Sequence, residues 1–304
     1  MKIPYTLIAF TIIVAFGLAA CGNGDEATTR DAEDTASAAD ETDDNGAEEN
    51  GAEDDSGLDI ASLSGGWYRA AQEYDPEEDW RNIVMVEVSD GEIVDATWTA
   101  APLTGGMDKM TSSMEGEYGM EEVAQSPWHE QAQATIDHLL ETQDPTDVEF
   151  TDDGKTDAIS GATITVSYFF DLAEEALSGS PDGFGSYEDG VYRGEAEAGD
   201  EWQDVVHITV VDGYIVSVHW APEPLDDQGM DKYEYSLEGE YGMESASDWA
   251  WHEHADAVAE FVIENQAVDA IELDDDGKTD AISGATVSLD GFYDAAQEAL
   301  AQAE

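Results

Sequence analysis

The sequence predicts an α+β protein of two tandem repeated domains, each a small antiparallel sheet packed with helices, after a disordered acidic tether. Three observations predict this fold. Long segments recur at one constant separation, β-branched runs flank two Asp-Gly dipeptides, and apolar residues recur at helical spacing farther along each repeat. Self-similarity at a fixed period is the sequence signature of a duplicated structural unit.

The duplication is the clearest of these observations. The segment Asp153–Thr163 returns unchanged as Asp276–Thr286, at a separation of 123 residues. Three shorter segments, Met-Asp-Lys, Glu-Gly-Glu-Tyr-Gly-Met and Trp-His-Glu, return at the same separation. The order and spacing of elements are therefore the same in both halves. The breaker-rich segment Ser178–Gly183 marks the joint, which predicts one domain over residues 58–180 and a second over residues 181–304.

Each repeat begins with strands. The dipeptides Asp90-Gly91 and Asp212-Gly213 lie between β-branched runs, which is a strong signal for a tight hairpin. The expected strands span residues 66–72, 83–88 and 93–98 in the first repeat and 190–195, 205–211 and 215–220 in the second.

Helices follow an irregular, glycine-containing loop. Ile136, Leu139 and Leu140 are three and four residues apart, a spacing typical of a helix with one apolar face. The expected helices span residues 127–142 and 166–177 in the first repeat and 248–265 and 287–300 in the second.

The first residues have the features of a secretory signal. Lys2 supplies a positive charge, and the apolar run that follows is shorter than the roughly 20 residues that span a bilayer. Leu18-Ala19-Ala20-Cys21 resembles a bacterial lipobox, in which the cysteine becomes the lipidated N-terminus. We expect a signal peptide over residues 1–20 and anchoring at the extracytoplasmic face of the cell membrane through Cys21. The alternative is an ordinary cleavable signal with an incidental cysteine.

Residues 21–57 form an acidic linker after this cysteine. The linker contains no aromatic residue, so it cannot bury enough apolar surface to offset its ordering entropy and is expected to be disordered. Because Cys21 is the only cysteine in the chain, an internal disulfide and a Cys-ligated metal or Fe–S cluster are excluded.

The charge balance is extreme, with 9 Lys plus Arg against 73 Asp plus Glu and a formal net charge of −64. Nucleic acid is excluded as a partner, because contact with phosphates needs a basic surface. The acids continue through the folded region, which is typical of a halophilic protein whose self-repulsion is screened by high external salt.

One motif carries the chemistry. The segment from Asp157 to Thr163, and its copy from Asp280 to Thr286, resembles the flavinylation motif of FMN-binding domains. That family includes the C subunit of the sodium-pumping NADH:quinone reductase and its relative in the Rnf complex. The resemblance implies a separate, Mg-dependent flavin transferase that cleaves FAD and leaves FMN joined through its phosphate to Thr163 and to Thr286. It also implies that Asp157 and Asp280 meet a metal or orient the loop.

The residue types suit that role. A threonine hydroxyl is a poor nucleophile without a base or metal, which the transferase would supply. The preceding small side chains would let another protein's active site approach the backbone; they are Ser160, Gly161 and Ala162, and Ser283, Gly284 and Ala285. Each threonine is expected to start the closing helix, where free N–H groups favour an attached phosphate. The alternative is a plain turn with a helix cap.

Other recurring residues are secondary candidates. Trp98 and Trp220 end matching strands and either flank the flavin ring or belong to the core. Lys109 and Lys232 lie in the glycine-bearing loop, and each either stabilises negative charge on the reduced cofactor or forms a salt bridge.

Two further groups are expected to be structural. His129 and His252 lie at helix starts beside tryptophans, where packing is the favoured role. The run Asp274-Asp275-Asp276-Gly277 is similar to part of a calcium loop but lacks the remaining ligand spacing, so no metal site is predicted.

These observations favour an electron carrier with two covalent FMN groups over an enzyme. The layout resembles that of Gram-positive flavoproteins of extracellular electron transfer. The resemblance implies a membrane NADH dehydrogenase–quinone system as donor and an external acceptor such as ferric iron. The alternatives are a ligand-binding surface lipoprotein without covalent flavin, a flavin reductase or regulatory module with non-covalent FMN, and a purely structural surface protein.

Overall fold

The computed structural model describes residues 58–120, 124, 126–226, 229–243 and 247–304. Cys21, the expected signal peptide and the expected acidic linker lie outside these residues. Both repeats belong to one compact unit. Within the described ranges, no helix combines the length and the apolar character needed to cross a membrane.

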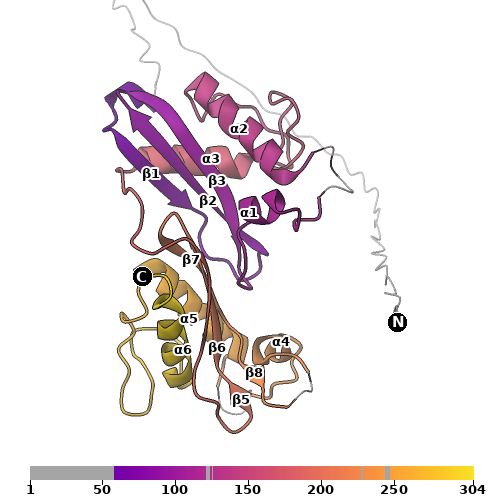
Figure 1. Cartoon of the computed structure of the whole chain (residues 1–304), viewed down its shortest axis with the longest axis vertical. Coiled ribbons are helices and arrows are strands. Elements are labelled where there is room, and N and C mark those ends of the chain that lie inside the picture. Colours follow the sequence, from indigo (N-terminus) through magenta and orange to yellow (C-terminus); the bar gives the residue numbers. More distant parts are fainter. Residues whose placement is uncertain (1–57, 121–123, 125, 227–228, 244–246) are drawn as a thin grey trace, which may run out of the picture. The chain divides into compact units, whose positions relative to one another are not determined.

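The first repeat contains the predicted antiparallel sheet, in the order β1-β2-β3 (Figure 1). Its strands are β1 (Gly66–Ala71), β2 (Trp80–Ser89) and β3 (Glu92–Pro102), preceded by a short 3-10 helix, η1 (Ile60–Ser62). The hairpin turns at Asp90 and Gly91, which have φ values of 53° and 81°. Two consecutive positive φ values are the geometry of a tight type I′ turn, which Asp-Gly favours.

The second repeat has the same sheet, in the order β4-β6-β7. Its strands are β4 (Gly190–Glu195), β6 (Val205–Val211) and β7 (Tyr214–Trp220). A separate two-stranded ladder pairs β5 (Trp202–Gln203) with β8 (Glu223–Pro224). In the first repeat this ladder is continuous with the sheet, because Trp80 of β2 pairs with Pro102 of β3.

The described residues of each repeat form three α-helices. They are α1 (Lys109–Met114), α2 (Trp128–Thr142) and α3 (Ser167–Ser178), followed by α4 (Lys232–Leu237), α5 (Trp251–Asn265) and α6 (Asp290–Leu300). The short helices α1 and α4 lie where an irregular loop was expected. Asp108 and Asp231 cap them, each accepting a bond from the backbone N–H three residues on. Each of these helices buries only one serine, so no apolar periodicity reveals it.

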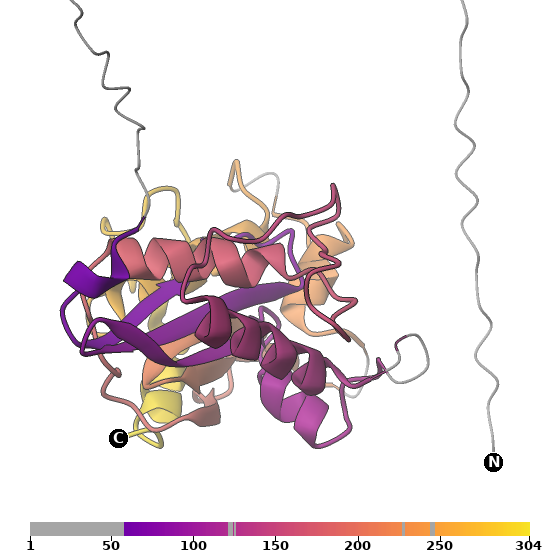
Figure 2. The same ribbon diagram turned by 90° about the horizontal axis from the view of Figure 1, so that it is seen from above.

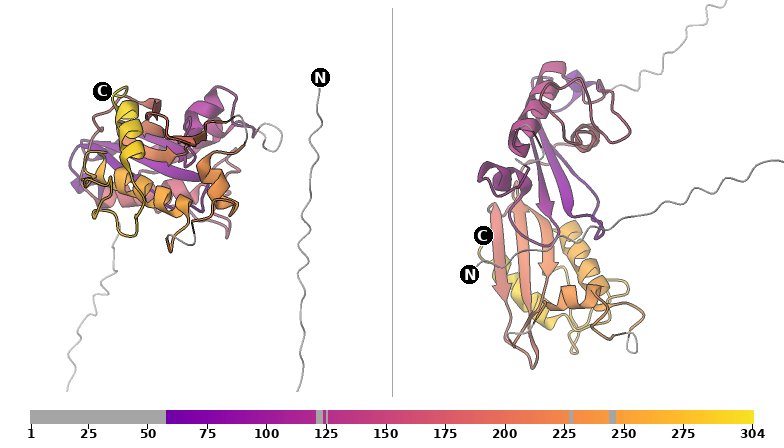
Figure 3. Two further views of the ribbon diagram at one scale, coloured as in Figure 1. Left: turned by 90° about the horizontal axis from the view of Figure 1, so that it is seen from below. Right: turned by 90° about the vertical axis from the view of Figure 1, so that its right-hand side faces the viewer.

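The helices cover one face of each sheet. α3 packs on β1 and β2 while α2 packs on β3 (Figure 2), and α6 and α5 take the same places in the second repeat (Figure 3). Trp98 is the centre of the first core, with ring centroids 5.0 Å from Trp128 and 5.4 Å from Phe169. Trp220 has the same role in the second core. Both tryptophans therefore belong to the core, and Trp98 also lines the cavity described below.

The opposite faces of the two sheets meet each other. β2 is buried on both faces, because Val84 and Val86 contact the helices while Ile83 packs with Val216 of the second repeat. Such burial explains a continuous apolar run where a one-sided strand would alternate. Polar contacts also cross this interface, since the Ser217 hydroxyl donates to the Pro102 carbonyl at 2.7 Å.

Candidate functional site

The two motif segments have the same local structure. Gly161 and Gly284 have φ values of 91° and 88°, a region that glycine reaches without strain. Ile159 and Ala162 are buried and anchor the first turn, whereas Thr163 between this turn and α3 is exposed. The second segment repeats the pattern, with exposed Thr286. The turn therefore presents each threonine to solvent from a fixed backbone.

The expected helix start at the threonine is wrong. α3 begins at Ser167 and α6 begins at Asp290, in each case four residues after the motif threonine. The N-cap residues are Val166 and Leu289, neither of which caps through its side chain. The threonine is therefore neither a helix cap nor a site at the end of a helix dipole. The left-handed glycine ends the motif turn, and a short non-helical connection leads from the threonine to the helix.

Gln131 holds Thr163 from a different element. Both the backbone N–H and the hydroxyl of Thr163 donate to Oε1 of Gln131, at 2.7 Å and 3.1 Å. The Gln131 side chain is buried on α2, and its Nε2 donates to the Ser126 carbonyl at 2.9 Å. The sequence analysis did not predict this contact. The one indication of a special role was that the repeats differ directly after the identical Trp-His-Glu segments, where the second repeat has His254 in place of Gln131.

The remaining motif residues are accessible. Ser160, Asp157, Ser283 and Asp280 are all exposed, so neither predicted carboxylate is buried beside its threonine. The residue before each aspartate is a buried threonine, whose hydroxyl accepts the backbone N–H two residues on and fixes the start of the turn.

A cavity of about 350 Å³ lies against the residues that follow Thr163. Its size falls within the range of small-molecule sites, about 300–1,000 Å³. Ile164, Thr165 and Tyr168 line it on the motif side. Rings from other elements also line it, and they are Trp80, Trp98, Tyr118 and Trp128. The charged side chains in the wall are two lysines and two acids, Lys109, Lys155, Glu78 and Asp79.

Lys109 lies among these rings. Its Nζ is 4.4 Å from the ring centroid of Trp80, 5.3 Å from that of Tyr118 and 5.8 Å from that of Trp128. Such contacts attract a cation to the ring faces. Burial lowers the pKa of Lys109 to about 8, against the opposing effect of Asp79.

Lys232 repeats this arrangement, 4.8 Å from the Tyr241 centroid and 4.7 Å from that of Trp251. Burial again lowers the lysine pKa. Neither lysine belongs to an ion pair in the part of the chain that the structure describes, so the salt-bridge alternative is wrong.

The two histidines at the helix starts are structural. Nδ1 of His129 is 2.9 Å from the Ser113 hydroxyl oxygen, which also accepts the His129 backbone N–H. His252 and Ser236 repeat both contacts. The pairs tie α1 to α2 and α4 to α5.

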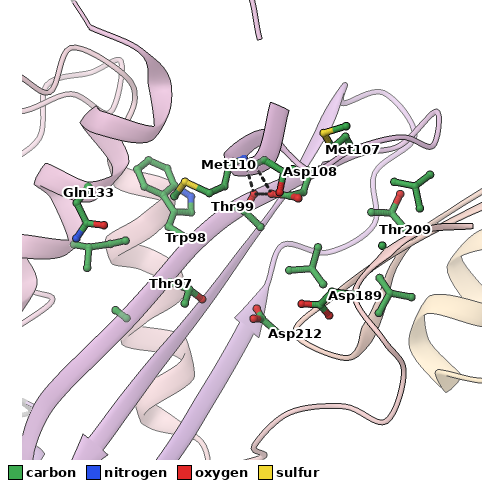
Figure 4. A pocket seen from close by; sticks show the side chains of 17 residues that line it. Thr97, Trp98, Thr99, Met107, Asp108, Met110, Gln133, Asp189, Thr209 and Asp212 are labelled. Carbon is green, nitrogen blue, oxygen red and sulfur yellow. Dashed lines mark hydrogen bonds between the residues drawn. The ribbon is translucent and has the colours of Figure 1, made fainter. Parts of the chain in front are cut away.

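Two cavities of about 600 Å³ or more lie apart from the motifs. One of about 630 Å³ is lined by Trp202, Leu225 and Tyr235 of the second repeat. Another of about 600 Å³ is lined by both repeats, with Asp189 and Asp212 facing the Trp98–Thr99 side (Figure 4). Neither includes Thr163 or Thr286 in its wall.

The acidic run near the second motif forms a turn. Oδ1 of Asp274 accepts the backbone N–H groups of Asp276 and Lys278, at 2.9 Å and 2.8 Å. Across the described ranges, no cluster of three or more His, Cys, Asp or Glu side chains is arranged to bind a metal ion.

Comparison with known proteins identifies the repeats. Residues 82–178 and 203–301 each match the family model of the FMN-binding domain, and together they cover more than half of the chain. A solution NMR structure of a Clostridium thermocellum protein is 46% identical, covering 38% of this chain and 91% of that chain with a TM-score of 0.31.

A crystal structure of a Clostridium perfringens protein is 23% identical, covering 38% of this chain and 87% of that chain with a TM-score of 0.29. No curated protein matches the chain. The two family matches show that this chain belongs to the FMN-binding domain family, as a tandem pair of such domains.

Proposed function

We propose that this protein is a membrane-anchored, extracytoplasmic electron carrier with FMN attached through phosphoester bonds to Thr163 and Thr286. One observation carries the proposal. Both FMN-binding repeats present an exposed motif threonine beside a turn that two buried side chains anchor, Ile159 and Ala162 in the first repeat and Ile282 and Ala285 in the second. A second protein can reach such a hydroxyl while the domain stays folded. Bound flavin would supply one-electron and two-electron chemistry.

Attachment needs little from this chain beyond access. The Thr163 oxygen would bond to the FMN phosphorus of FAD, the pyrophosphate bond would break, AMP would leave, and the hydroxyl proton would pass to a base of the transferase. A Cβ placed on Gly161 would meet nothing within 4 Å, so this side of the turn is open to another protein.

The cavity beside Thr163 fits a flavin ring. Its walls combine aromatic rings with Lys109, Lys155 and two acids, Glu78 and Asp79. The rings and the two lysines would favour a planar ring that gains negative charge. Trp80, Tyr118 and Trp128 would pack against the ring and exclude water. Lys109 would stabilise negative charge on the reduced cofactor, and Lys232 would do so in the second repeat.

The anchor and the partners complete the proposal. Lipidation at Cys21 would hold the chain on the membrane, and the acidic linker would hold the domains away from its surface. A membrane NADH dehydrogenase–quinone system would donate electrons and an external acceptor such as ferric iron would take them. Covalent attachment suits this setting, because a free cofactor outside the cell would diffuse away.

Electron transfer is tested directly on purified protein. The chain is co-expressed with a flavin transferase, photoreduced without oxygen and mixed with ferric citrate while flavin absorbance is followed. We expect reoxidation by ferric iron, and none in a Thr163→Ala/Thr286→Ala double variant, which should carry no flavin. A colourless wild-type chain would favour the ligand-binding lipoprotein instead.

A further inference from the structure

The two attachment sites differ at the residue that holds the motif threonine. In the first repeat the neutral amide of Gln131 accepts two hydrogen bonds from Thr163. The same position of the matching helix α5 is occupied by His254. An imidazole gains a proton near neutral pH and an amide does not.

His254 has an unsatisfied polar atom. The residue is fully buried, at 0% exposure, and its Nε2 lies 3.0 Å from the Ser247 hydroxyl oxygen. Nδ1 is also buried but has no hydrogen-bond partner among the residues that the structure describes. Leaving a buried polar atom unpaired costs about 1–3 kcal/mol. Such an atom in a functional domain calls for an explanation, and an absent ligand is one.

The histidine lies beside the second motif. The Trp249 ring packs on His254 with centroids 5.5 Å apart, and a Cβ placed on Gly284 would collide with that same ring. The Gly284 backbone also lies near enough to the ring to raise the pKa of His254, but it does not reach hydrogen-bond geometry with Nδ1. The first repeat differs, because it has Ser126 at the position of Trp249 and leaves Gly161 uncovered.

The surroundings of His254 carry little charge. Burial lowers the pKa of His254, and the nearby carboxylate that opposes this effect is Glu253 on the same helix. The loop before α5 contributes the Ser247 hydroxyl and the Trp249 indole, and the motif contributes the Gly284 carbonyl. All three are uncharged. A fixed anion on the motif threonine would therefore be the strongest new charge near this ring.

We propose that His254 is a positioning residue for the FMN phosphodiester on Thr286, to which its protonated ring donates a hydrogen bond from Nδ1. The proposal rests on covalent attachment at Thr286. The phosphodiester anion stabilises the imidazolium form, so the pKa of His254 is higher in the flavinylated chain than in the unflavinylated chain. At a pH between these two values, attachment of FMN takes up one proton from solvent. Gln131 has no group that gains a proton near neutral pH. Proton uptake on FMN attachment is therefore expected at Thr286 and not at Thr163.

The test uses the phosphorus nucleus as a reporter. A phosphodiester has no proton to lose from about pH 5 to about pH 9, so a change in its ³¹P chemical shift there reports a neighbouring group. Each flavin is observed alone, on Thr286 in Thr163→Ala and on Thr163 in Thr286→Ala, with attachment verified by intact mass. We expect the Thr286 signal to titrate with a histidine midpoint and the Thr163 signal to stay flat.

Matched substitutions locate the effect. His254→Gln should abolish the titration while FMN remains on Thr286, and Gln131→His should weaken the contact with Thr163 and create a titrating signal there. A second measurement keeps His254 in place, so its result does not depend on whether the His254→Gln variant folds correctly. In ¹⁵N NMR of flavinylated Thr163→Ala, the pKa of His254 should exceed that in the unflavinylated chain.

A flat ³¹P signal on a fully flavinylated Thr286, with an unchanged His254 pKa, overturns this inference and leaves the proposed function intact. Absence of FMN from both threonines in the mass spectrum overturns both.

Discussion

Nζ of Lys109 lies 4.4 Å from the ring centroid of Trp80, inside a wall of aromatic side chains next to the first motif. Cations are scarce in this chain, with 9 against 73 acids. With so many carboxylates in the chain, a lysine has many possible ion-pair partners. Lys109 and Lys232 instead lie over aromatic rings. Burying an ammonium group is costly, and cation–π contacts offset only part of that cost. An ammonium group without an ion-pair partner can interact with a ligand that gains negative charge.

Removing this charge should lower the potential of the adjacent flavin. Lys109→Gln is expected to lower the midpoint potential of the Thr163 flavin by about 30 mV or more, which is about 1.4 kcal/mol for a two-electron couple. Potentiometric titration in the Thr286→Ala background measures this. Lys232→Gln should act on the Thr286 flavin alone.

The exposed Lys278 of the second repeat supplies the control for the first flavin, since Lys278→Gln should leave the potential of the Thr163 flavin unchanged. The pKa of Lys109 is about 8, so its effect should fade as the pH rises above that value. Equal shifts in the Lys109 and Lys278 variants would contradict a local role.

Asp212 should make the stability of the protein depend on pH. Burial and the nearby Asp189 raise the pKa of Asp212 to about 6, against the opposing effect of Arg69. When folding raises the pKa of a carboxyl, the folded state holds a proton that the unfolded state has lost. The free energy of unfolding therefore falls as the pH rises from the unfolded pKa, about 3.9, to the folded pKa. Asp212→Asn should therefore raise the free energy of unfolding at neutral pH by about 1–3 kcal/mol and leave it unchanged below about pH 4.

Asp90 is the matched control for that experiment. It occupies the same turn position in the first repeat with a φ of 53° against 55° for Asp212, and it is exposed. Asparagine tolerates this conformation, so Asp90→Asn should change stability by less than about 0.5 kcal/mol. Chemical denaturation across the pH range gives both values, and an equal gain in the two variants would count against burial as the cause.

The motif glycines should differ in their tolerance of a side chain. Gly161 and Gly284 have nearly the same positive φ, so alanine strains both backbones equally. Only at Gly284 would the added Cβ also collide with a ring, that of Trp249. Gly284→Ala should therefore cost about 1–3 kcal/mol more stability than Gly161→Ala. Thermal unfolding of the two variants tests this, and equal losses would show that Trp249 moves aside at little cost.

Much of the fold could be predicted from local sequence signals. Asp-Gly turns between β-branched runs gave both hairpins, although β3 continues beyond Trp98 to Pro102 because Trp80 extends the partner strand. The core helices α2 and α5 followed from apolar spacing. The helices α1 and α4 were missed because their stability comes from an aspartate cap and not from buried apolar residues.

The candidate site was predictable only in part. The repeated motif pointed to Thr163 and Thr286, but the helix start was misplaced because a left-handed glycine precedes each threonine. Gln131 is distant in sequence from Thr163, and a polar residue on a helix gives no sign that it is buried. Contacts of this kind depend on how the helix packs on the motif turn, which a single sequence does not record.

The attachment of FMN to the two threonines is tested most directly by intact mass and in-gel flavin fluorescence after denaturation. Wild type, Thr163→Ala, Thr286→Ala and the double variant are each co-expressed with a flavin transferase. We predict two FMN-sized additions in wild type, one in each single variant, none in the double variant, and fluorescence that survives denaturation whenever an addition is present. An unmodified wild-type chain, or additions that persist when both threonines are replaced, would contradict the account.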